Sequence, residues 1–236
     1  MKAEKQNVRK YYKYDVDNPV YNIAKVGSIT NNNGILSGFS ASNYAQLPNS
    51  FVHNSQPWEI QFKVTTGSNV NTQGCICEQL FNGSKYTGLT LYIQSGTFRM
   101  RGGNGSSNIV DIDSSYSIKA NTTYWFKAEF TGSKYNFYAS TDGTSWTQVT
   151  SVSSNSILTD NYSMNIGRRN YSAGSYPWLG EIDLNESYIK VNGEYFWQGV
   201  TEPIIDGSET DYDFYKDVDV YKVIKDSNKY YAVNER

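Results

Sequence analysis

The segment TYWFKAEFTGSKYNFYA, residues 123–139, determines the fold class of this chain. Apolar and polar residues alternate through Thr123–Phe130 and again through Tyr135–Ala139, the pattern of β-strands with one buried face. Thr131–Lys134, which contains Gly and Ser, has the composition of a hairpin turn. The segment therefore predicts two antiparallel strands that bury aromatic rings on one side.

The same pattern recurs on both sides of this hairpin. Alternating or apolar runs occupy Trp58–Val64, Gly88–Ile93, Tyr162–Gly167 and Trp178–Val191, and turn residues such as Asp142-Gly143 separate such runs. No stretch has a convincing helical period. About a dozen short strands without helices predict two antiparallel sheets packed face to face.

Composition supports an all-β chain and excludes several functions. Of the 236 residues, 15% are aromatic and 21 are Tyr, so rings supply much of the core. The chain has 21 Lys and Arg against 23 Asp and Glu, a balance that argues against binding nucleic acid. It begins without the apolar stretch of a signal peptide and has no run of about 20 apolar residues, so we expect no membrane insertion.

We predict three regions along the chain. Residues 1–25 form an extended N-terminal arm, residues 26–200 the β-sandwich, and residues 201–236 a small C-terminal β-strand appendage. The arm is basic, whereas Glu202–Asp219 holds seven acidic residues and one Lys. Opposite charge at the two ends suits contacts between subunits. The alternatives are that both ends are solvated surfaces and that the arm is a disordered terminus.

The two cysteines and the single histidine do not form a metal site. Cys75 and Cys77 lie two residues apart, so we expect both on one face of a strand, as reduced core residues. His53 has no partner ligands nearby in the sequence, and no Asp/Asn cluster has the spacing of a calcium site. We therefore expect no metal and no cofactor.

The order of these features resembles that of laminin G-like, concanavalin A-like domains. Pro57–Phe62 is similar to their early inner strand, and Asn121–Lys127 to their tryptophan–tyrosine strand. Met164–Gly167 and then Trp178–Asp183 resemble the closing signature, Ile-Gly followed by aromatic-x-Gly-x-Ile-Asp. The resemblance implies a two-sheet antiparallel jelly-roll sandwich in which Ile166 and Ile182 face the core.

Within that superfamily, the run from Gly180 to Trp197 looks most like tail and virion proteins of bacteriophages that infect gut bacteria. The composition, which is rich in Asn, Ser and Tyr, and the opening segment Tyr11–Tyr14 also resemble those phage proteins. This resemblance implies a virion protein, assembled in the host cytoplasm, that contacts other virion proteins through its arm and its appendage.

One motif resembles a catalytic signature. Glu181-Ile182-Asp183-Leu184-Asn185-Glu186 is similar to the E-I-D-x-x-E motif of laminarinase-type glycoside hydrolases, which implies Glu181 as nucleophile, Asp183 as its assistant and Glu186 as acid/base. A retaining mechanism needs two carboxyl groups about 5–5.5 Å apart. Simple alternation places Glu186 on the opposite face from Glu181 unless a β-bulge intervenes. The structural interpretation leaves Glu181 and Glu186 as ordinary solvent-facing residues, and we expect no catalytic residue.

A loop between two of the predicted strands is the candidate glycan-binding patch. Sugar binding needs exposed rings to stack on pyranose faces and polar neighbours to orient hydroxyls. The loop offers both, and the alternative is that its tyrosines pack on their own sandwich. Its candidate residues are Arg168, Arg169, Asn170, Tyr171 and Tyr176.

The sequence thus favours a non-enzymatic bacteriophage virion protein of the tail, baseplate or head surface. Its lectin-like sandwich would attach to a host-surface glycan, and we expect a homo-oligomer. Two alternatives stay open: a purely structural decoration subunit without a ligand, and a laminarinase-type glycoside hydrolase that uses Glu181 and Glu186.

Overall fold

The computed structural model describes ten segments of the chain: residues 11–12, 23–51, 54–79, 87–154, 156–158, 162–169, 176–199, 209–210, 222–226 and 229–233. By their contacts, residues 21–200 form one compact unit, and residues 1–20 together with 201–236 form another. The described segments contain β-strands and no helix, so none of them includes a helix able to cross a membrane.

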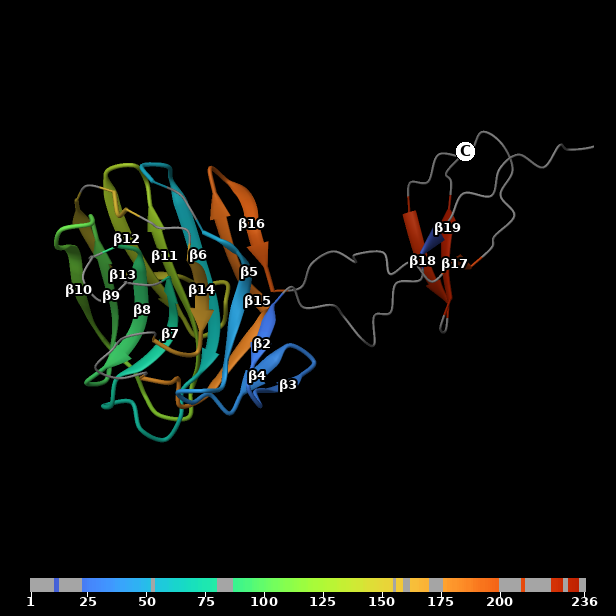
Figure 1. The fold of residues 1–236 in the computed structure, drawn as a ribbon, viewed down its shortest axis with the longest axis horizontal. Coiled ribbons are helices and arrows are strands. Elements are labelled where there is room, and N and C mark those ends of the chain that lie inside the picture. Colours follow the sequence, from blue (N-terminus) through green and yellow to red (C-terminus); the bar gives the residue numbers. More distant parts are fainter. Residues whose placement is uncertain are drawn as a thin grey trace, which may run out of the picture. The chain divides into compact units, whose positions relative to one another are not determined.

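The larger unit is a sandwich of two antiparallel sheets (Figure 1). One sheet has seven strands among the described residues. In spatial order these strands are β10 (Asn108–Ser117), β9 (Thr97–Gly103), β8 (Leu89–Gln94), β7 (Gly74–Gln79), β14 (Ser163–Ile166), β5 (Tyr44–Ser50) and β2 (Ala24–Val26).

The opposing sheet has eight described strands. Their order is β13 (Thr147–Ser153), β12 (Lys134–Ser140), β11 (Thr123–Phe130), β6 (Trp58–Thr65), β15 (Glu181–Val191), β4 (Ile35–Ser37) and β3 (Thr30–Asn32), and β16 (Glu194–Gln198) pairs with β15. The central strands β11, β6 and β15 come from distant parts of the sequence. The two-sheet jelly-roll sandwich predicted from the sequence is confirmed.

Alternation determines which residues enter the core. In β6 and β11 every second side chain is buried and the residues between them are half-buried, as a strand with one face on the core requires. The residue opposite a buried side chain on the next strand is also buried: Phe126 pairs with Phe62 and Phe130 with Trp58. Each strand therefore presents one apolar and one polar face.

Aromatic rings join the two sheets. Phe98 of β9 stacks on Phe126 of β11 with ring centroids 4.2 Å apart, and meets Phe137 of β12 edge-on at 5.7 Å. Phe130 and Tyr135 stack at 4.6 Å beside Trp58. Because such pairs contribute about 0.5–1.5 kcal/mol beyond the burial of their area, rings compensate for a chain with few aliphatic residues.

The closing signature combines buried isoleucines with glycines at tightly packed backbone positions. Ile166 and Ile182 are fully buried, as expected. Gly167 has a φ of +82°, and a Cβ there would lie 2.0 Å from the Phe39 ring. A Cβ on Gly180 would lie 1.9 Å from the carbonyl oxygen of Thr65. Both positions therefore require glycine for close packing.

The prediction that Cys75 and Cys77 share one face of a strand is wrong. The pairing of β7 with β8 shifts between them, so Cys75 pairs with Tyr92 and Cys77 with the adjacent Leu91, whose side chain points to the other face. Both thiols are free and buried, and burial raises the pKa of each. They are unreactive packing residues at neutral pH.

In the smaller unit, strand β1 (Tyr11–Tyr12) pairs antiparallel with β17 (Glu209–Thr210). Strand β18 (Lys222–Asp226) pairs with β19 (Lys229–Val233) as a hairpin. Residues from the two ends of the chain therefore meet in one β-structure. The predicted division at residues 25 and 200 stays a prediction.

The Phe98 stack leads to a test of the fold. We expect Phe98→Ala to lower the free energy of unfolding by about 3–5 kcal/mol, because it removes a fully buried ring and leaves a cavity between the sheets. Urea denaturation measures the loss. Phe98→Leu is the control and should cost less than half as much; equal losses for the two variants would contradict the role of the stacked ring.

Candidate functional site

The candidate loop from the sequence analysis is described only at its two ends. Arg169 is buried and forms a 3.0 Å ion pair from Nε to Oε1 of Glu78, on the outer side of the seven-stranded sheet. Arg168 lies over the ring of Tyr44, with its guanidinium carbon 4.4 Å from the ring centroid. Tyr176 is half-buried. Arg168 and Arg169 thus have structural partners within the sandwich.

Asn170 and Tyr171 lie outside the described residues, so the structure does not bring the five candidates together as a surface. Tyr176 does contact its neighbours: its carbonyl accepts a hydrogen bond from the backbone N–H of Cys75 at 3.0 Å, and Arg169 lies over its ring at 5.8 Å. The glycan-binding role of this loop stays a prediction.

The richest array of polar and aromatic side chains lies on the outer face of the eight-stranded sheet. The strand register arranges these side chains in rows across β12, β11, β6 and β15. We call this surface the outer face. Its first row is Asn136, Glu129, Glu59, Lys190 and Tyr195; its second is Tyr138, Lys127, Gln61 and Tyr188; its third includes Trp125, Lys63 and Asp183.

Three lysines of the outer face lie over aromatic rings. Lys63 Nζ is 4.9 Å from the centroid of Trp125, and Lys190 Nζ is 4.9 Å from Tyr188 and 4.6 Å from Tyr195. Lys127 Nζ lies 4.8 Å from Tyr138 and 4.6 Å from the ring of Trp146, in the loop after β12. Ammonium groups therefore contact these rings, and the rings of Tyr188 and Tyr195 also meet edge-on with centroids 5.7 Å apart.

A β-bulge in β15 brings the carboxylates of the E-I-D-x-x-E motif to this face. Asp183 pairs with Lys63, and the next paired residue, Tyr188, lies opposite Gln61. The chain therefore moves five positions along β15 where it moves only two along β6. The hydroxyl of Ser187 closes the bulge: it donates to the carbonyl of Asp183 at 2.6 Å and accepts the backbone N–H of Lys63 at 3.2 Å. Simple alternation therefore fails here, and Glu186 points to the same side as Asp183.

Glu186 is exposed, as expected, but its carboxylate has partners on two other strands. Lys63 Nζ lies 2.6 Å from Oε1 of Glu186 and 3.0 Å from Oδ2 of Asp183, and Trp125 Nε1 donates to Oε2 of Glu186 at 2.8 Å. Both oxygens of Glu186 are thus occupied. Burial lowers the pKa of Lys63, but its hydrogen bonds and attraction to the two carboxylates outweigh burial and raise that pKa above its usual value.

Glu181 is exposed, in the next row with Thr65, and the described residues give its carboxylate no hydrogen bond or ion pair. The structure therefore places three carboxylates of the motif on one face but binds only two of them to Lys63. No group of three or more His, Cys, Asp or Glu side chains among the described residues has the arrangement of a metal site.

Two phenols bind carboxylates in the first row. Tyr188 donates to Oε1 of Glu59 at 2.5 Å, and Tyr138 donates to Oε1 of Glu129 at 2.9 Å. Burial and, after it, the bond to Glu59 raise the pKa of Tyr188 well above its usual value. Sequence reasoning missed this row because its members lie up to 136 positions apart in the chain; alternation shows which way each side chain points but not the register between strands.

The loop from Ser140 to Trp146 supports the outer face and provides a test of it. Gly143 has a φ of +74°, and a Cβ there would lie 2.9 Å from the Trp125 ring. We expect Gly143→Ala to displace the indole, break its bond to Glu186 and shift the tryptophan fluorescence. Gly132→Ala is the control, because Gly132 also has a positive φ but open space around it. Identical spectra for the two variants would contradict this packing.

The Tyr188 phenol predicts a dependence of stability on pH. Because its pKa is raised by folding, its contribution is complete below about pH 10, the usual pKa of Tyr, and declines as the pH rises above that value. We expect the wild type to lose more unfolding free energy between pH 9 and 11.5 than Tyr188→Phe, measured by urea denaturation. Tyr195→Phe, at an exposed ring of the same face, should follow the wild type; parallel profiles for all three proteins would contradict the assignment.

Comparison with known proteins places the sandwich among solved folds. No protein-family model matches the chain, and no curated protein is a significant match to its sequence. Domain 4 of AbnA, a GH43 extracellular arabinanase from Geobacillus stearothermophilus whose structure is a complex with arabinotriose, has a TM-score of 0.54 and 14% identity over 84% of this chain and 96% of that chain.

Two further structures are similar at 12% identity. The enzymatically active domain of bacteriophage CBA120 tailspike protein 2 has a TM-score of 0.52 and covers 74% of this chain, but only 29% of the tailspike chain is matched. The LG1-3 region of the laminin α2 chain has a TM-score of 0.50, with 71% and 33% covered. Such identities establish the fold alone: the larger unit is a two-sheet antiparallel jelly-roll sandwich, the fold that these domains share.

Proposed function

We propose that the sandwich is a non-enzymatic, lectin-like domain that binds a glycan through its outer face. The observation that carries the proposal is the array of half-buried or exposed rings, including Trp125, Tyr188 and Tyr195, placed among amide, ammonium and carboxylate groups. Rings of this kind stack on sugar faces, and the polar groups beside them orient hydroxyls. The arabinanase domain crystallised with arabinotriose shares the fold, which supports the proposal.

The proposed setting is a bacteriophage virion, on the tail, baseplate or head surface, where the domain attaches to a host-surface glycan. The resemblance of Gly180–Trp197 to phage virion proteins supports this setting, as does a tailspike domain of the same fold. The paired strands β1 and β17 bring the two chain ends together, which suits a separate attachment unit toward other virion proteins and further copies of this chain. A purely structural subunit is the alternative without a ligand.

Binding is tested with the full chain by affinity gel electrophoresis against arabinan, laminarin, galactomannan and dextran. We expect retardation in at least one gel, and we expect Tyr195→Ala to weaken it about three- to tenfold, because the change removes an exposed ring and the support of Lys190. The matched control is Tyr162→Ala, which removes a similarly exposed ring away from the outer face. A wild type that no polysaccharide retards, or equal affinities for both variants, would contradict the proposal.

One observation favours a hydrolase as the second candidate: the bulge places Glu181, Asp183 and Glu186 on one face. Against it, Lys63 and Trp125 occupy both oxygens of Glu186, so neither oxygen is directed at a leaving group. We therefore expect no reducing sugar when laminarin is incubated with the protein at high concentration. Release of sugar that Glu181→Gln abolishes would replace the lectin proposal by the hydrolase.

A further inference from the structure

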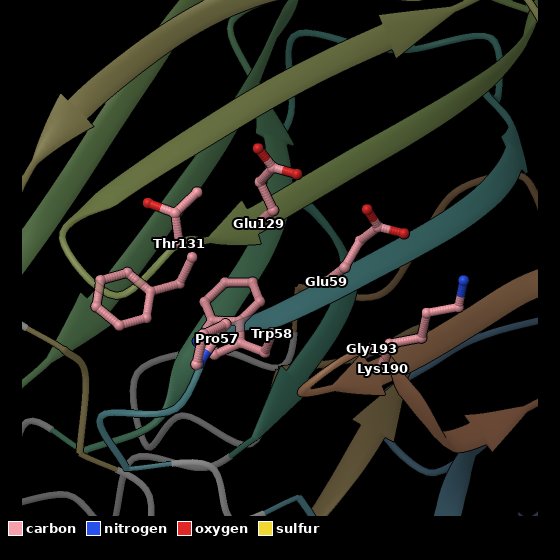
Figure 2. Close-up of a pocket in the computed structure, with 8 residues that line it drawn as sticks. Pro57, Trp58, Glu59, Glu129, Thr131, Lys190 and Gly193 are labelled. Atoms are coloured by element: carbon pink, nitrogen blue, oxygen red, sulfur yellow. The ribbon is translucent and has the colours of Figure 1, made fainter.

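A hollow of about 320 Å³ opens at one end of the outer face, where β6 begins and β11 and β15 end. Figure 2 shows Glu129, Glu59 and Lys190 side by side on these three strands, with their charged ends directed to the same side of the sheet. Trp58 and Thr131 also line it. Its volume is at the small end of the range for ligand pockets, roughly 300–1,000 Å³, and suits one sugar residue better than an oligosaccharide.

The two carboxylates of the hollow face each other across the sheet. Glu129 pairs directly with Glu59 in the register of β11 and β6, and like charges in that position destabilise a sheet. Lys127 compensates only weakly, at 3.9 Å from Oε2 of Glu59. The fold does not need both charges, since the bonds that Glu129 Oε1 accepts from Asn136 and Tyr138 require only an acceptor oxygen.

Each carboxylate also has an oxygen available to a ligand. The hydrogen bonds that Glu59 and Glu129 accept within the described segments end on Oε1, and none reaches Oε2 of either residue. On the other side of the hollow, Lys190 lies over the rings of Tyr188 and Tyr195 but has no described carboxylate within ion-pair distance. The hollow thus offers two acceptors and one cationic donor in a single row.

We propose that this hollow binds one neutral, hydroxyl-rich sugar residue of the glycan, an inference that rests on the proposed function. The two carboxylates accept hydrogen bonds from neighbouring hydroxyls, and the Lys190 ammonium donates to a sugar oxygen. Because two carboxylates and one ammonium line the hollow, a uronate or sialate carboxylate would meet net repulsion. The site therefore selects neutral sugars over acidic ones.

The first experiment compares Glu129→Gln and Lys190→Met with the wild type on the polysaccharide that retards it most. We expect each change to weaken binding at least fivefold. Glu129→Gln should also raise the melting temperature by about 1–3 °C, because it removes the like-charge pair. Glu194→Gln, the same substitution at an exposed residue of β16 outside the hollow, is the control and should change neither quantity.

The second experiment uses methyl glycosides that differ only at C6: glucoside against glucuronide and galactoside against galacturonide. In competition with the bound polysaccharide, we expect the neutral member of a pair to be at least fivefold more effective. An acidic member that competes equally or better would overturn the neutral-sugar assignment.

The outcomes separate the two proposals. Loss of binding in Tyr195→Ala with wild-type binding in Glu129→Gln and Lys190→Met would overturn the hollow as the sugar site and leave the lectin proposal standing. A wild type that no polysaccharide retards would overturn both.

Discussion

The stack of Phe98 on Phe126 between the sheets is the contact on which the rest of the structure depends. It fixes which residues of β11 face inward, and through strand register it fixes those of β6, β12 and β15 as well. Every second residue must then face outward. The rings that build the core and the rings that build the outer face are thus two halves of one alternating pattern, and a shift of one residue would exchange them.

The bulge in β15 interrupts this pattern on the outer face. An unbroken strand would turn Glu186 toward the core, where an unpaired carboxylate is strongly unfavourable. The extra residues instead carry Glu186 outward to Lys63 and Trp125, and Leu184 stays buried. A motif that resembles a catalytic signature thereby links three strands, β15, β6 and β11, through the contacts of Glu186. The sequence of the motif does not distinguish a catalytic from a structural role, because the difference lies in which donors bind the carboxylate oxygens.

Much of the fold could be predicted from the sequence, because the alternation in Trp58–Val64 and Thr123–Phe130 is local. The bulges could not: neither Cys75–Cys77 nor Asp183–Tyr188 contains a glycine or proline that marks an irregular strand.

The candidate site was harder to predict because its contacts are long-range. Arg169 lies in a loop that reads as a binding surface, yet its partner Glu78 is 91 residues away and the pair is buried. The row from Glu129 to Lys190 depends in the same way on strands that are far apart in sequence.

The lysines of the outer face determine where binding energy is available. Each ring that faces outward beside Lys63, Lys127 or Lys190 already has an ammonium over it, and an exposed contact of this kind is worth about 0.5–1 kcal/mol. A sugar that displaces the ammonium loses that contact, so the net gain from stacking is smaller than at a ring without an ammonium.

Hydrogen bonds to charged groups are worth more, about 1.5–3 kcal/mol each, and the row of Glu129, Glu59 and Lys190 is where they are available. A single small hollow of this kind yields a weak site. Useful attachment then requires several copies bound at once, since linked sites gain affinity without any new contact. The proposed virion, which displays many copies of its surface proteins, is a setting in which a weak site of this kind suffices.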